Sequence, residues 1–74
     1  MNKAQVIAKI RRSKAFHDEG VEGAVHLFIT GVDSDAPHVL YGITEDAVLF
    51  SDDDGAALSE CESQSFEAFI AEAF

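Results

Sequence analysis

Lysine and arginine are missing from most of this 74-residue chain. The five basic residues all lie in the first fourteen positions, namely Lys3, Lys9, Arg11, Arg12 and Lys14. The fourteen Asp and Glu residues all follow from Ala15 onward, which gives a net charge of −9. A typical soluble surface intersperses both signs of charge. Turn chemistry alone therefore does not explain a stretch from Ala15 to the end that has no cation.

Cysteine, proline and tryptophan are scarce as well, with one, one and none. The single cysteine, Cys61, excludes an internal disulfide, so no covalent cross-link stabilises the chain. The segment Met1–Lys3 lacks the apolar region of a signal peptide, and no apolar run approaches the roughly 20 residues that span a bilayer. These absences predict a soluble, cytoplasmic protein with no membrane partner.

The length of the chain predicts one domain, residues 1–74, because there is no space for a second core. A chain this short hides only about 60% of the surface that it exposes when unfolded, so we expect a stability of a few kcal/mol. A homodimer is an open alternative, because a second copy would add buried surface to so small a core.

The segment Asn2–Lys14 has the pattern of a helix. Asn2 and Gln5 form a capping-box pair, and apolar residues follow at helical spacing. The cations of the last turn suit the negative end of the helix dipole. A basic helix end can contact nucleic acid or a membrane. Five cations beside fourteen acids are more often paired inside the protein, and we favour that interpretation.

The segment Ser63–Phe74 is the second predicted helix, and either Ser63 or Ser65 can cap its start. Its apolar side chains recur at the spacing of one helix face, namely Phe66, Phe69, Ile70, Ala73 and Phe74. Such a stripe can be a binding face. In so small a chain, three Phe side chains on one stripe are more typical of a core.

Three segments have the apolar pattern of strands: Ala24–Thr30, His38–Ile43 and Ala47–Ser51, with Ala57–Ser59 as a short fourth. We expect Ala15–Gly23 to be a connector. Links this short favour antiparallel neighbours. The predicted fold is therefore α+β, with an N-terminal helix, a three- to four-stranded antiparallel meander and a C-terminal amphipathic helix packed on the sheet.

Both faces of the segment Ala24–Thr30 are fairly apolar. Either helices cover more than one side of the sheet, or the second face meets a partner. A hairpin centred on the loop Gly31–Pro37 would place His26 opposite Gly42. The three histidines do not have the spacing of metal ligands.

In a meander, the first and third loops share one end of the sheet, so the acids form two groups. One end would carry Asp33, Asp35, Asp52, Asp53 and Asp54. The opposite end would gather Glu22, Glu45, Asp46, Glu60 and Glu62. Under the simpler alternative, acids only fill exposed turns, where Asp is favoured in any case.

The sequence contains no pattern of a catalytic, metal or cofactor site. The run 52–55 is similar to part of a calcium loop. With Gly55 at the sixth position of an EF-hand, however, Phe50 and Cys61 occupy the first and twelfth positions, which need Asp and Glu. Weak calcium binding by this loop stays an alternative. Cys61 lies between two glutamates, which should raise its pKa and blunt it as a nucleophile. We expect neither an enzyme nor a bound cofactor or metal.

Charge suggests a function. Duplex DNA presents a dense line of negative charge, and its protein partners contact it largely through Lys and Arg. In size and charge, the chain is similar to small acidic inhibitors of phages and mobile elements, such as anti-restriction and anti-CRISPR proteins. We therefore expect a non-enzymatic nucleic-acid mimic that covers a basic, nucleic-acid-binding surface of a partner protein and does not itself bind nucleic acid. The expected partner-binding residues are Asp33, Asp35, Glu45, Asp46, Asp52, Asp53 and Asp54.

Two other interpretations stay open. The chain can be a general interaction module, such as an immunity protein, an antitoxin or a subunit of a complex. It would then bind through apolar residues such as Phe28 or Tyr41, with acids only at the rim and weak salt dependence. Alternatively, the acidity is an adaptation to high salt, and other proteins of the same genome would share it.

Overall fold

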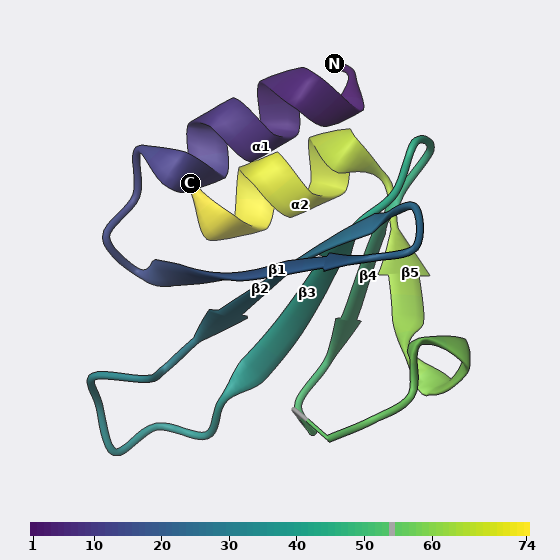
Figure 1. The fold of residues 1–74 in the computed structure, drawn as a ribbon. Coiled ribbons are helices and arrows are strands. Elements are labelled where there is room, and N and C mark those ends of the chain that lie inside the picture. Colours follow the sequence, from purple (N-terminus) through teal and green to yellow (C-terminus); the bar gives the residue numbers. More distant parts are fainter. Residues whose placement is uncertain (54) are drawn as a thin grey trace.

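The computed structural model describes residues 1–53 and 55–74 and confirms the α+β class. Within these residues, two helices cover one face of a five-stranded antiparallel sheet (Figure 1). The elements in chain order are α1 (Lys3–Arg11), β1 (Phe16–Glu22), β2 (Val25–Thr30), β3 (Val39–Ile43), β4 (Val48–Ser51), the 3₁₀ turn η1 (Leu58–Glu60), β5 (Glu62–Gln64) and α2 (Phe66–Ala73).

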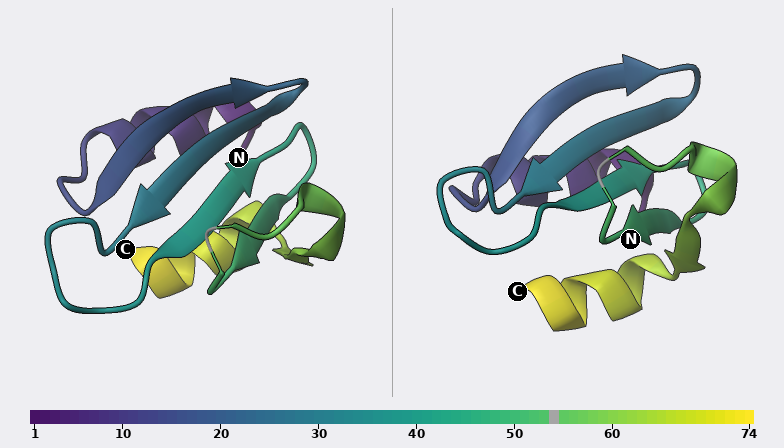
Figure 2. Two further views of the ribbon diagram at one scale, coloured as in Figure 1. Left: turned by 60° about the horizontal axis from the view of Figure 1, so that its bottom comes forward. Right: turned by 90° about the horizontal axis from the view of Figure 1, so that it is seen from below.

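The strands follow chain order across the sheet, from β1 to β5, and each neighbouring pair is antiparallel. The predicted meander is therefore confirmed, although it has five strands in the described chain instead of three or four. Figure 2 shows the twist of the sheet, which separates the β1–β2 hairpin from β4 and β5. No helix of the described residues is long and apolar enough to cross a bilayer.

The expected connector Ala15–Gly23 is instead mostly strand β1. This strand lies at the edge of the sheet, and only its first two residues are half-buried, so it lacks an apolar pattern. Gly20 has a φ of 90° beside a shift in the β1–β2 register, and Gly23 has a φ of 61° in the two-residue turn to β2. Charged side chains and a bulge protect an edge strand from unwanted pairing. Because they interrupt the apolar alternation, the sequence pattern did not predict this strand.

The strand expected at Ala57–Ser59 is wrong as well. Backbone hydrogen bonds from Glu60 to Ala57 (2.9 Å) and from Cys61 to Leu58 (3.2 Å) close the 3₁₀ turn η1 there. These local bonds satisfy the backbone without a partner strand. The strand that pairs with β4 is β5, five residues further along the chain.

The register of β2 and β3 differs by one residue from the predicted hairpin. His26 lies opposite Ile43, and Leu27 is the residue opposite Gly42. Residues that face each other across two strands share a side of the sheet, so a shift of one residue changes every side-chain partner. The observed register pairs Phe28 with Tyr41 on the helix-covered face.

Both helices begin at the predicted caps. The Asn2 side chain accepts a hydrogen bond from the Gln5 backbone at 2.9 Å, and the Gln5 side chain accepts one from the Asn2 backbone at 2.8 Å. In α2, Ser65 Oγ accepts from the Ala68 backbone at 3.1 Å, so Ser65 is the cap and Ser63 lies in β5. Helix α1 ends at Arg11, three residues earlier than expected.

Replacing the cap of α2 tests this assignment. We expect Ser65→Ala to lower the free energy of unfolding by about 1 kcal/mol, because an N–H group at the helix start loses its acceptor. The matched control is Ser63→Ala, which is expected to change stability by less than about 0.5 kcal/mol. Urea denaturation followed by circular dichroism measures both. Equal losses in the two variants would contradict Ser65 as the cap.

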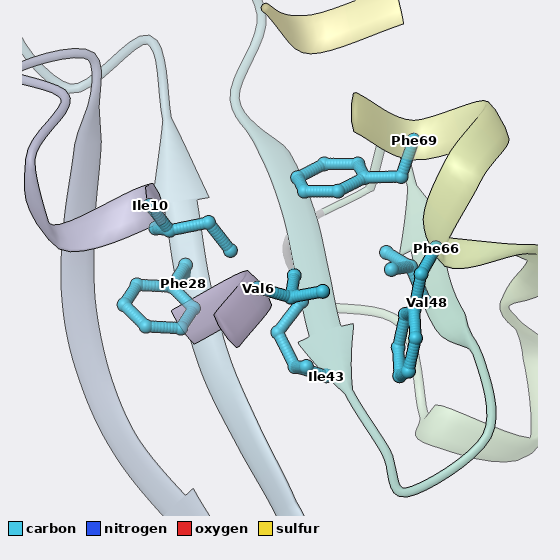
Figure 3. Packing of buried hydrophobic residues seen from close by; sticks show 7 residues of the cluster. All are labelled: Val6, Ile10, Phe28, Ile43, Val48, Phe66 and Phe69. Atoms are coloured by element: carbon cyan, nitrogen blue, oxygen red, sulfur yellow. The ribbon is translucent and has the colours of Figure 1, made fainter. Parts of the chain in front are cut away.

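The core lies between the helices and the middle of the sheet (Figure 3). It includes both predicted stripes, since α1 and α2 each contribute two buried side chains and three strands contribute one each. Its residues are Val6, Ile10, Phe28, Ile43, Val48, Phe66 and Phe69. The prediction that the Phe stripe of the C-terminal helix is core is thus confirmed for Phe66 and Phe69, whereas Phe74 is 49% exposed at the chain end.

Candidate protein-interaction surfaces

Four of the predicted partner-binding acids lie at one end of the sheet. The β2–β3 loop carries Asp33 and Asp35, and the segment after β4 carries Asp52 and Asp53. In an antiparallel meander these two connections return at the same end, and Figure 1 shows both opposite the short β3–β4 turn. We call these four residues the acidic end. Asp54, which was predicted to join them, lies outside the described residues.

Turn chemistry and pairing account for two of the four acids. The Asp53 carboxylate accepts a hydrogen bond from the Gly55 backbone at 2.9 Å, as Asp does in many turns. Asp33 Oδ2 lies 3.2 Å from His17 Nε2 on β1. The Asp35 and Asp52 side chains are exposed and accept no hydrogen bond from the described part of the chain. Local structure therefore gives no reason for an acid at either of these two positions.

Glu45 and Asp46 lie at the other end of the sheet, in the β3–β4 turn. The Thr44 hydroxyl shapes this turn, accepting from the Asp46 and Ala47 backbones at 3.2 and 2.9 Å. Glu45 Oε1 lies 3.5 Å from Lys3 Nζ of α1. The predicted set of partner-binding residues is thus divided between two ends, as the meander implied.

The prediction for Glu60 and Glu62 is wrong. They were expected beside Glu45, but β5 runs antiparallel to β4 and places Glu62 opposite Phe50, near the acidic end. Glu60 lies in η1, just before β5. The error arises because the last strand was predicted at residues 57–59, where the structure has the turn η1, and not at β5. In their observed positions, Glu60 and Glu62 add two carboxylates to the side of the molecule that carries Asp52.

The cations lie on or next to α1, away from the Asp52 segment. Lys3 pairs with Glu45, and Arg11 Nη2 lies 3.4 Å from Asp18 Oδ2, so the expected internal pairing is confirmed for these two. Lys14 lines a hollow of about 240 Å³ together with His17 and Asp33, at the β1 side of the acidic end. The β4–β5 side of that end therefore has the more uniform negative charge.

Asp18 lies on the edge strand β1, within reach of Arg11 on helix α1. Its Oδ1 accepts from the Gly20 backbone at 2.8 Å and lies 2.8 Å from His26 Nε2, whose ring stacks on Phe28 at 4.6 Å. The Gly20 hydrogen bond, then His26 and Arg11, lower the pKa of Asp18. His26 thus contacts a carboxylate and an aromatic ring. The hairpin predicted from the sequence would have placed His26 opposite Gly42.

This lowered pKa predicts how stability changes in acid. Because the pKa of Asp18 is lower in the folded chain than its ordinary value of 3.8, the ionised form stabilises the fold above that value, and the contribution is lost as the pH falls through the folded pKa. We expect Asp18→Asn to have a lower urea midpoint than the wild type at pH 6. The difference should shrink below about pH 4. A difference that stays constant with pH would contradict this role.

The described residues contain no group of three or more His, Cys, Asp or Glu that could hold a metal ion. A second hollow, of about 400 Å³, is lined by Asn2, Lys3, Ala4, Ile7 and Glu45 and is open to solvent. Ligand sites are usually concave and largely apolar, with a few convergent polar groups. This hollow does not have that arrangement.

Among the residues that the structure describes, two groups have raised pKa values. Burial, followed by Glu60, raises the pKa of the Cys61 thiol, whose Sγ lies 3.6 Å from the Ala57 carbonyl oxygen. The expected direction is confirmed, but burial is a larger cause than the neighbouring glutamates. Burial also raises the pKa of Tyr41, with Asp52 and Glu72 as smaller causes. Both side chains are therefore held in their neutral, weakly nucleophilic forms.

The sheet face opposite the helices is apolar, and we call it the open face. Ile29 and Leu40 are 6% and 8% exposed, yet they are not part of the core cluster between helices and sheet. By strand register they share the open face with Val25, Leu27, Gly42 and Leu49. Val25, Leu27 and Leu49 are half-buried.

The structure corrects the residues named for an apolar interaction module. Phe28 is 1% exposed in the core, and Tyr41 packs against the same core from the helix-covered face. An apolar partner would instead meet Val25, Leu27 and Leu49. The available signal was that both faces of Ala24–Thr30 are apolar, but the sequence does not tell which face the helices cover.

Comparison of the chain with protein-family models, curated proteins and solved structures gave no match.

Proposed function

We propose that this chain is a small, non-enzymatic inhibitor that occupies a basic, nucleic-acid-binding surface of a partner protein. The observation that supports it most is the separation of charge. Asp35, Asp52 and Asp53 lie at one end of the sheet, Glu60 and Glu62 follow nearby, and the chain has no Lys or Arg after Lys14. A partner surface that accepts phosphates would be attracted to this end.

The physical basis is electrostatic complementarity. Several carboxylates gathered at one end of a sheet produce a negative potential that sums over the residues. Opposite charges on two surfaces speed association and exclude partners of the same charge. Exposed charges are screened beyond about 8 Å at physiological salt. Binding of this kind should therefore weaken steeply as salt rises.

The two groups of acids set the size of the partner surface. β3 has five residues, so Glu45 and Asp46 lie roughly 17 Å along the strand direction from the acidic end. Glu45 is also paired with Lys3. A partner that contacts both groups must present cations over that distance. We propose the acidic end as the primary contact and Glu45 and Asp46 as a secondary one.

A pull-down from host-cell lysate tests this function. The purified chain serves as bait at low and high salt, with and without added DNA. We expect capture of a basic, nucleic-acid-binding protein that DNA displaces and that high salt releases. Capture that ignores both DNA and salt would contradict mimicry and favour an apolar interaction module. Capture of nothing would leave salt adaptation as the simpler explanation of the acidity.

The open face favours the second candidate, a general interaction module. Val25, Leu27 and Leu49 form a half-buried apolar surface on the sheet face that neither α1 nor α2 covers. A homodimer could also bury this face. Sedimentation equilibrium distinguishes that case, because a dimer of this kind forms without any partner and persists at high salt.

A further inference from the structure

We draw no further inference here: the strongest candidate, the surface patch where Asp52 and Glu72 lie near the half-buried Tyr41 ring, adds one acid and one tyrosine to the acidic end already described, and nothing in the structure shows what covers it.

Discussion

A chain with alanine in place of Phe69 is expected to lose most or all of its folded population. Phe69 is 1% exposed, and its ring lies 5.2 Å from that of Tyr41 and 6.1 Å from that of Phe16. Removing a buried Phe costs about 3–5 kcal/mol. A chain of this size has a total stability of about 3–5 kcal/mol. We therefore expect no cooperative urea transition, or one with a midpoint close to zero denaturant.

The matched control for this prediction is Phe74→Ala. Phe74 follows the same helix and belongs to the same stripe, but it is 49% exposed. It stacks on Phe16 at 5.8 Å and lies under Lys9 Nζ at 5.5 Å, so we expect a loss of about 1 kcal/mol and a retained transition. Similar losses in both variants would contradict the placement of α2 against the sheet.

Reversing two charges at the acidic end is expected to weaken partner binding about 30-fold. The variant is Asp35→Lys/Asp52→Lys, chosen because neither carboxylate accepts a hydrogen bond from the described chain. Each reversal removes an attraction of about 0.5 kcal/mol and adds a repulsion of similar size. Two reversals thus amount to about 2 kcal/mol, or roughly 30-fold in affinity. Isothermal titration against the captured partner measures the change.

The control carries the same change in net charge on another surface. Glu19→Lys/Glu67→Lys places the same charges on β1 and on the first turn of α2, where both side chains are exposed. We expect it to reduce affinity by less than about threefold, through the long-range field alone. If both double variants weaken binding equally, only the total charge matters and the acidic end is not the contact. Unchanged urea midpoints must accompany either result.

The sequence was sufficient for the elements whose local chemistry and packing agree. Asn2 and Gln5 predict a helix start because their side chains and backbones satisfy each other. The stripe containing Phe66 and Phe69 predicts a buried helix face, and both residues are in the core. The apolar run of β2 suits a strand that is paired on both sides, and β2 lies between β1 and β3 in the sheet.

The elements that the sequence missed are those whose stability depends on their neighbours. β1 is an exposed edge strand, and its pairing with β2 comes from backbone hydrogen bonds that no side-chain pattern reveals. β5 has only three residues, and none of them is buried. The one-residue register error around His26 arose because the Gly31–Pro37 loop allows more than one hairpin length.

For the candidate site, the predicted strand order determined which acids were expected to lie together. The expectation holds where the predicted strands are correct and fails where they are not. Asp33 and Asp35 share an end with Asp52 and Asp53 because the meander is correct, whereas Glu60 was misplaced together with the last strand. The open face could not be found from the sequence. A strand with two apolar faces gives no indication of which one the helices will cover.

The most direct test of the proposed function is a competition for the captured partner. A fluorescent DNA duplex bound to that partner is titrated with the purified chain at low salt, and fluorescence anisotropy reports whether the duplex is released. We predict complete displacement of the duplex, with an inhibition constant that rises steeply with salt and rises further for Asp35→Lys/Asp52→Lys. A stable ternary complex, in which the duplex stays bound while the chain binds elsewhere, would contradict the proposed occupation of a nucleic-acid-binding surface.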